Sequence, residues 1–274
     1  MDCTDDVRVA GSCDGRWGDR GVKDAPIETP KGSFPDHGHL LVLGDSLAFH
    51  GPRQAMPPGD ARLFPQVAGG ALGTPVDLVA RQGWTARDAW WALTKDPVVW
   101  GTYLPRADAL LLAVGGMDQL PAPVPTWVRD SIPYLPSGRA RRVARDAFRS
   151  ATPPAVRHFG GPFRTLPQAA TDRYLTRIVQ GVRALRPKLP IALMGPAPWT
   201  GPYYPNTSRH RPAVHAAKRW AHAHDVTYVD IEDLVAPRLA SCNPDGLHWS
   251  WEVHGLVGHA IADAFGAEND GKQD

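Results

Sequence analysis

Five short apolar segments recur along the chain, and each ends at a polar or glycine-containing turn. They are Leu40–Gly44, Val76–Ala80, Asp108–Val114, Leu189–Met194 and Val226–Ile231. Short apolar runs bounded by turn residues are typical of buried strands. The third run is apolar at almost every position, as a strand covered on both faces requires. The pattern therefore predicts five buried strands.

Helical periodicity fills the intervals between these strands. The expected helices lie near 63–72, 85–93, 171–186, 213–224 and 251–265. The segment from Thr85 to Asp88 resembles a capping box and marks the start of one of them. Strands that alternate with helices favour a mostly parallel sheet with helices on both faces. The sequence thus predicts an α/β fold.

Residues 136–170 interrupt this alternation with a concentration of positive charge. They contain seven arginines against a single acid, Asp146. The arginines are Arg139, Arg141, Arg142, Arg145, Arg149, Arg157 and Arg164. Part of the segment, near Arg139–Phe148, fits a basic helix. Two interpretations remain open: a solvated face on an insertion, or a lid or rim that attracts an anionic ligand such as a carboxylate or phosphate.

Length and composition are consistent with one domain. The chain has 274 residues, of which 43% are hydrophobic, and this is enough for one sizeable core. The formal net charge of +2 is too small to imply a nucleic-acid partner. We expect a disordered leader at 1–37, a domain at 38–266 and a disordered tail at 267–274. The first segment lacks the apolar core of a signal peptide, and no apolar run reaches membrane length, so we expect a cytoplasmic protein.

A serine follows the first predicted strand directly, in the turn Gly44-Asp45-Ser46-Leu47. Open α/β sheets place their ligand sites at the carboxyl ends of strands. By itself this turn fits a polar turn or helix cap better than it fits a nucleophile. Serine is a weak nucleophile unless a base and an orienting acid accompany it.

A base and an acid stand together near the C-terminus, at Asp245 and His248. Histidine can hold a proton near neutral pH, and a carboxylate beside it fixes its tautomer and stabilises the imidazolium. An Asp-x-x-His spacing has little specificity alone. In combination with Ser46 it predicts a Ser-His-Asp arrangement for acyl transfer.

These blocks resemble the SGNH/GDSL family of serine hydrolases and acyltransferases over roughly residues 38–265. The nucleophile block matches Gly44–Leu47, the glycine block matches Gly83, and the final block matches Asp245–His248. The third block, Gly-x-Asn-Asp in the family, falls on Gly115–Asp118. The resemblance implies a flavodoxin-like three-layer sandwich with a mostly parallel five-stranded sheet. It also implies catalytic roles for Ser46, Asp245 and His248.

The third block departs from the family pattern, because Met117 stands where the family has an oxyanion-hole asparagine. A thioether cannot donate a hydrogen bond. The resemblance then leaves the backbone N–H groups of Ser46 and Gly83 as the oxyanion hole. Three explanations are open: a substitute donor, a slow enzyme, or a different alignment of this block.

A closer resemblance, to one acyltransferase branch of the family, rests on four segments. These are His50–Pro52, Arg81–Trp91, Gly116–Pro121 and Asn243–Trp249. That branch also carries methionine in the third block. The resemblance implies transfer of a medium-chain, octanoyl-like acyl group to a hydroxyl of a glycosylglycerate-type acceptor through an acyl-enzyme on Ser46. The alternatives are an esterase or lipase that hydrolyses carboxylic esters, and a non-catalytic sugar- or lipid-binding protein on the same scaffold.

Three further residues are candidates for substrate binding: Asp118 in the third block, and Trp84 and Trp249 beside the proposed catalytic loops. Trp90 and Trp91 fit a helical core position better than a sugar platform. The histidines after residue 200 lack tight metal-ligand spacing, so neither a metal nor a cofactor is expected. The expected partners are a small-molecule acyl donor, ester or thioester, and a sugar-type acceptor. No nucleic-acid partner is expected, and the oligomeric state stays open.

Overall fold

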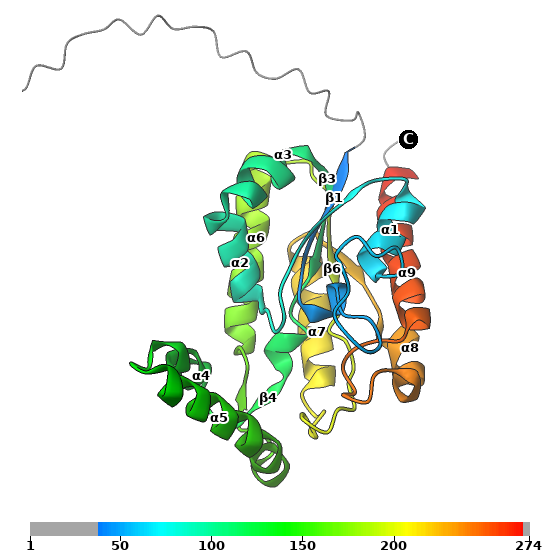
Figure 1. Ribbon diagram of the computed structural model, residues 1–274. Coiled ribbons are helices and arrows are strands. Elements are labelled where there is room, and N and C mark those ends of the chain that lie inside the picture. The colour runs from blue at the N-terminus through cyan, green and yellow to red at the C-terminus, as the bar shows by residue number, and fades with distance from the viewer. Residues whose placement is uncertain (1–37, 271–274) are drawn as a thin grey trace, which may run out of the picture. The chain divides into compact units, whose positions relative to one another are not determined.

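The structure is a computed structural model that describes residues 38–270, with side chains described as far as residue 266 (Figure 1). The expected leader at 1–37 lies outside the described residues, and so do residues 271–274 of the expected tail. Within the described part, no helix has the length and apolarity needed to cross a bilayer.

One parallel sheet of five strands forms the centre of the domain. Its strands are β1 (His39–Gly44), β2 (Val76–Ala80), β3 (Ala107–Ala113), β6 (Ile191–Met194) and β7 (Thr227–Val229), in the order β2-β1-β3-β6-β7. All five strands lie where the apolar runs predict them. β6 and β7 are each shorter than their runs.

Alternate residues of the central strands point to opposite faces of the sheet. Leu41 and Leu43 of β1 belong to one core cluster, and Leu40 and Val42 to the other. All four side chains are fully buried. A strand with core on both sides favours apolar residues at nearly every position, and this explains the continuous apolar runs.

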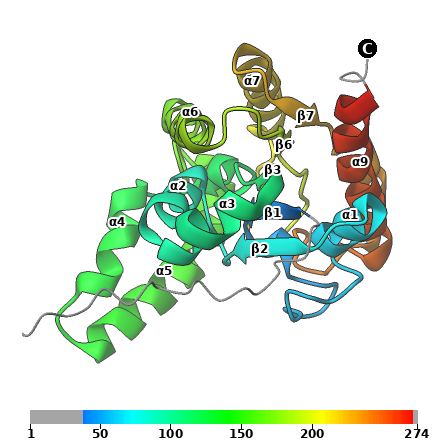
Figure 2. The same ribbon diagram turned by 90° about the horizontal axis from the view of Figure 1, so that it is seen from above.

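Two helical layers cover the two faces (Figure 2). One face packs against α2 (Ala86–Lys95), α6 (Gln168–Leu185) and α7 (His210–Ala223). The other packs against α1 (Phe64–Leu72), α8 (Glu232–Val235) and α9 (Trp251–Asp270). The three-layer α/β sandwich is therefore confirmed. α9 runs four residues into the segment expected as a tail.

Within residues 38–270, one long segment lies outside the three layers. It runs from β4 (Pro121–Ala122) to β5 (Phe163–Arg164), and these two strands pair antiparallel. We call residues 121–164 the excursion. It contains α4 (Thr126–Ser131) and α5 (Gly138–Phe159), and it contributes no residue to either core cluster. It begins earlier than the basic segment 136–170, and it ends before α6. Figure 1 shows α4 and α5 set apart from the sheet.

α5 is longer than the basic helix expected near 139–148, because it continues through Pro153 and Pro154. Proline in a helix leaves the carbonyl four residues earlier without its N–H partner. Here those carbonyls belong to Arg149 and Ser150, which are both exposed, so water can satisfy them. The remaining short elements are 3-10 turns at Ser46–Ala48, Met117–Gln119, Ile132–Tyr134 and Ala236–Ser241, a π-helical turn at Val99–Tyr103, and α3 (Leu104–Arg106).

Candidate active site

The strand order places a topological switch point between β1 and β3. From β1 the chain crosses to β2 on one side, and from β3 it crosses to β6 on the other. Because the two connections diverge, a crevice opens at the carboxyl ends of these strands. Ser46 follows β1 there, and the block with Met117 follows β3.

Ser46 occupies the first position of the 3-10 turn that ends β1. Asp45 caps this turn: its carboxylate accepts a hydrogen bond from the backbone N–H of Leu47 at 2.9 Å. The Ser46 carbonyl accepts from the N–H groups of Phe49 and His50. The cap and the turn hold the serine rigidly, and its side chain is only 6% exposed. Asp45 therefore supplies the helix cap that the Gly-Asp-Ser turn suggests, and the Ser46 side chain is not used for capping.

Ser46, His248 and Asp245 form a hydrogen-bonded chain. His248 Nε2 lies 3.0 Å from Ser46 Oγ, and His248 Nδ1 lies 2.6 Å from Asp245 Oδ2. The other oxygen, Asp245 Oδ1, accepts the backbone N–H groups of Leu247 and His248. With Nδ1 protonated towards Asp245, Nε2 is free to accept the serine proton. The structure thus brings the three residues together, although Ser46 and His248 are 202 positions apart in the sequence.

The loop that carries Asp245 packs tightly against the loop after β6. Gly246 has a φ of +68°, and a Cβ there would lie 2.3 Å from the backbone nitrogen of Gly201. The N–H of Thr200 donates to the Gly246 carbonyl at 3.0 Å. A side chain at position 246 would push the two loops apart and move His248 with them. The glycine within Asp-Gly-Leu-His is required by this contact.

The surroundings of His248 and Asp245 determine the charge that each side chain carries. Burial lowers the pKa of His248 below its usual 6.5, the hydrogen bond to Asp245 opposes this, and His50 lowers it further. Burial raises the pKa of Asp245, but hydrogen bonds from His248 and two backbone N–H groups outweigh this effect, so the net pKa falls below 3.8. The resting pair is a neutral imidazole beside a carboxylate, which is the state a general base requires.

His50 is a neighbour of the site that sequence reasoning did not assign a role. Its ring stacks on His248 with centroids 3.7 Å apart and planes at 21°. The N–H of Phe64 donates to His254 Nδ1, so Nε2 of His254 carries the proton and lies 3.1 Å from the His50 carbonyl. Burial lowers the pKa of His254 to about 4, which keeps this ring neutral. The signals in the sequence were its position four residues after Ser46 and its place in the His50–Pro52 segment of the closer resemblance.

Gly83 and Met117 lie on the same cavity as Ser46. Gly83 has a φ of +73°, a conformation that favours glycine. Within residues 38–270, the backbone N–H groups of Ser46 and Gly83 donate to no protein acceptor. Both therefore remain free to stabilise an anionic oxygen. Met117 supplies only a thioether to this wall, as expected.

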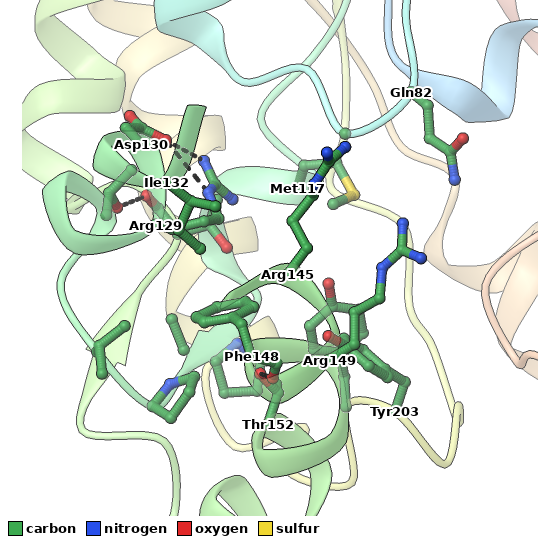
Figure 3. A pocket seen from close by; sticks show the side chains of 18 of the residues that line it. Gln82, Met117, Arg129, Asp130, Ile132, Arg145, Phe148, Arg149, Thr152 and Tyr203 are labelled. Carbon is green, nitrogen blue, oxygen red and sulfur yellow. Dashed lines mark hydrogen bonds and ion pairs between the residues drawn. The ribbon is translucent and has the colours of Figure 1, made fainter. Parts of the chain in front are cut away.

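The cavity above Ser46 has a volume of about 960 Å³. Ser46, Asp245 and His248 line one part of it, and the excursion supplies most of the opposite wall. Its apolar lining residues are Met117, Pro121, Ala122, Pro123, Val124, Ile132, Pro133, Phe148, Pro202 and Leu247. Figure 3 shows Phe148, Arg145 and Arg149 on α5, Met117 from the block after β3, and Tyr203 from the loop after β6.

The three expected substrate-binding residues do not line this cavity. Asp118 is buried and accepts from the Ala86 N–H and the Thr171 hydroxyl, so it braces the start of α2. Trp84 borders a separate open groove and lies near Arg81. Trp249 is fully buried between Phe64 and His254, because the residue after His248 turns into the core. A wall position in this cavity, expected for Trp84 and Trp249, is not where the structure places them, and a role of the three residues in substrate binding stays a prediction.

Sequence reasoning also missed several lining residues. Gln82, Ile132, Phe148 and Tyr203 come from four different segments, and no motif connects them. Two compositional signals were present: a clustering of proline and tyrosine at 202–205, and the concentration of arginine around Phe148. Trp90 packs partly buried against the core, whereas Trp91 is 40% exposed beside Arg87 and Lys95.

The described residues contain no group of three or more His, Cys, Asp or Glu side chains placed to hold a metal ion. Two of the histidines after residue 200 have structural partners. His210 contacts the Pro196 carbonyl, and His224 contacts Thr176.

Comparisons with known proteins agree with this geometry. Residues 42–256 match the GDSL-like Lipase/Acylhydrolase family. The chain is 37% identical over 232 residues to the diglucosylglycerate octanoyltransferase of Mycolicibacterium hassiacum, covering 82% of this chain and 94% of the relative. It is 36% identical over 232 residues to the protein of the same name from Mycobacterium tuberculosis, covering 82% and 91%.

Among solved structures, a lipase/acylhydrolase from Enterococcus faecalis superposes with a TM-score of 0.55 at 15% identity. The match covers 84% of this chain and 96% of that one. At this identity the likeness concerns the fold alone.

Proposed function

This chain belongs to the GDSL-like lipase/acylhydrolase family and is an enzyme of the acyltransferase or esterase type, and we propose that it transfers a medium-chain acyl group to a hydroxyl of a glycosylglycerate-type acceptor. The observation that carries the proposal is the Ser46–His248–Asp245 chain opening into a cavity of about 960 Å³. The acyl length and acceptor class follow the names of the two relatives.

In the first step, Ser46 Oγ attacks the carbonyl carbon of the acyl donor while His248 Nε2 takes the serine proton. Asp245 holds the imidazole in the required tautomer and stabilises the imidazolium. The oxyanion faces the N–H groups of Ser46 and Gly83. When the tetrahedral intermediate collapses, His248 gives its proton to the leaving group and an acyl ester remains on Ser46.

In the second step, His248 removes the proton of an acceptor hydroxyl, whose oxygen attacks the acyl-enzyme. The bond between the acyl carbon and Ser46 Oγ then breaks, and His248 returns the proton to Ser46. Water in this position gives hydrolysis, and a sugar hydroxyl gives transfer. The apolar walls from the excursion favour transfer, because they can bind a fatty acyl chain and exclude water from the acyl-enzyme. The cytoplasmic location expected from the sequence is part of the same proposal.

Product analysis with an octanoyl thioester, with and without glucosylglycerate, tests the proposal. We expect an octanoylated acceptor in the complete mixture and only slow release of octanoate without the acceptor. Equal release of free octanoate in both mixtures, with no acylated acceptor, would support the esterase alternative. The Ser46→Ala variant serves as the blank in each mixture.

A further inference from the structure

One face of α5 forms part of the cavity wall. Arg141, Arg145, Phe148, Arg149 and Thr152 all line the cavity. Their spacing of three and four residues places them on one side of the helix. Figure 3 shows the side chains of Arg145 and Arg149 extending from α5 towards Met117 and Gln82. Where a helix normally presents apolar residues to a neighbour, this one presents guanidinium groups.

These arginines have no carboxylate partner within residues 38–270. Arg141 donates to the Leu135 carbonyl and Arg145 to the Arg141 carbonyl, so neither is neutralised. The two acids on the cavity wall are engaged elsewhere. Asp130 pairs with Arg87 and Arg129, and Asp245 pairs with His248. The cavity therefore carries uncompensated positive charge in the same space as Ser46.

The distribution of this charge indicates the kind of anion that fits. From residue 141 to residue 149 a helix rises about 12 Å. A single carboxylate is satisfied by one bidentate arginine. Three guanidinium groups over that length suit a ligand with several phosphates, which accept charge-assisted hydrogen bonds at separate points.

We propose that Arg141, Arg145 and Arg149 bind the phosphate groups of the acyl donor, which is a phosphorylated acyl thioester. The inference rests on the proposed acyl transfer and adds the residues that bind the phosphate end of the donor. In this arrangement the phosphates lie along α5, and the thioester reaches across the cavity to Ser46. The apolar residues of the excursion receive the acyl chain.

Two octanoyl thioesters that differ only in the carrier test this assignment. Octanoyl-coenzyme A carries phosphates, and octanoyl-N-acetylcysteamine carries none. The test variant is Arg145→Gln/Arg149→Gln, because both side chains are exposed and their loss leaves the core intact. We expect kcat/KM with the phosphorylated donor to fall about 10- to 100-fold, mainly through KM, and kcat/KM with the neutral donor to stay unchanged.

The matched control is Arg142→Gln/Arg157→Gln. It removes the same charge from exposed positions of the same helix that do not line the cavity. We expect it to leave both donors unaffected. An equal loss in control and test variants, or an equal loss with both donors, would overturn the assignment.

A binding measurement separates this inference from the proposed function. Adenosine 3′,5′-bisphosphate, titrated into the Ser46→Ala protein, reports on phosphate binding without any turnover. We expect salt-sensitive binding whose dissociation constant rises at least about 10-fold when Arg145→Gln/Arg149→Gln is added. If the bisphosphate binds as expected but the enzyme transfers no acyl group, the proposed function is refuted and the phosphate site is not. Binding that the two substitutions leave unchanged would refute the phosphate site.

The acceptor provides the other source of an anion, through a glycerate carboxylate. With the neutral donor, the KM for glucosylglycerate and for uncharged glucosylglycerol is compared in the test variant and in the unsubstituted protein. We expect the two substitutions to leave the KM for each acceptor unchanged. A KM that rises for glucosylglycerate alone would assign the arginines to the acceptor carboxylate and contradict the proposal.

Discussion

His248 is held by a different residue on each accessible side of its ring. Asp245 contacts Nδ1 at 2.6 Å, Ser46 contacts Nε2 at 3.0 Å, and His50 covers one face with centroids 3.7 Å apart. The carboxylate favours the imidazolium, whereas burial and the second imidazole disfavour it. The balance leaves the ring neutral above its lowered pKa and ready to accept the serine proton.

Asp245→Asn tests this balance. An amide cannot stabilise the imidazolium and need not fix the tautomer, so we expect kcat to fall on the order of 10²- to 10⁴-fold. In the parent enzyme, activity is lost as the pH falls through the His248 pKa, because the protonated ring cannot act as a base. Since Asp245 raises that pKa, its removal shifts the acid limb of the pH profile of kcat/KM to lower pH.

The control for this experiment is Asp263→Asn, at an exposed position of α9. We expect it to preserve both the rate and the profile. A variant at position 245 with near-normal kcat, or with an unmoved acid limb, would show that Asp245 does not act through His248.

At the scale of elements, the sheet could be predicted from the sequence, and the cavity could not. Strands buried on both faces need continuous apolar runs, so the sequence pattern predicts the strands that contain Leu40–Leu43 and Leu110–Leu112. The turn at Ser46 could also be predicted, because neighbouring residues in the sequence form it. His50 and Trp249 depend on how distant loops pack, and local patterns carry no such information. The excursion was recognised by its charge, but its start at Pro121 depends on a pairing with Arg164 that only the fold reveals.

The excursion can be removed, because its two ends lie opposite each other. Ala122 pairs with Phe163, so residues 123–162 can be replaced by a two-residue Asn-Gly turn. No residue of the excursion belongs to either core cluster. We therefore expect the deletion variant to fold, with a Tm within a few degrees of the parent, and circular dichroism checks this.

We also expect the deletion to separate two activities. Octanoyl transfer should fall at least about 100-fold, because the acyl-binding and arginine-bearing walls are gone. Hydrolysis of a short acetyl ester should remain, because it needs only Ser46, His248, Asp245 and the N–H group of Gly83, all of which lie outside the deleted segment. A folded deletion variant that retains octanoyl transfer would contradict the role given to the excursion.

For the whole molecule, the site carries a cost in stability. Burial raises the pKa of Asp45 and of Asp118 to about 7 from 3.8, although hydrogen bonds to each carboxylate oppose it. The folded protein then binds more protons than the unfolded chain between pH 3.8 and pH 7. Its free energy of unfolding therefore decreases as the pH rises through this window.

Asp45→Asn tests this linkage. The side-chain carbonyl can still accept the Leu47 N–H, but the titrating group is gone. Three pKa units at one site correspond to on the order of 4 kcal/mol, so we expect a clearly smaller loss of stability between pH 4 and pH 8. Urea unfolding at a series of pH values measures it, with Asp263→Asn as the control. A pH dependence identical to that of the parent would argue against a buried, protonated Asp45.

In the proposed reaction Ser46 carries the acyl group, and mass spectrometry of the trapped enzyme measures this directly. The protein is mixed with an octanoyl thioester in the absence of acceptor, quenched in acid and digested. We expect the peptide containing Ser46 to carry one octanoyl group, which disappears when glucosylglycerate is added before the quench and never forms in Ser46→Ala. Octanoyl transfer that persists in Ser46→Ala, or an acyl group found on a different residue, would contradict the account.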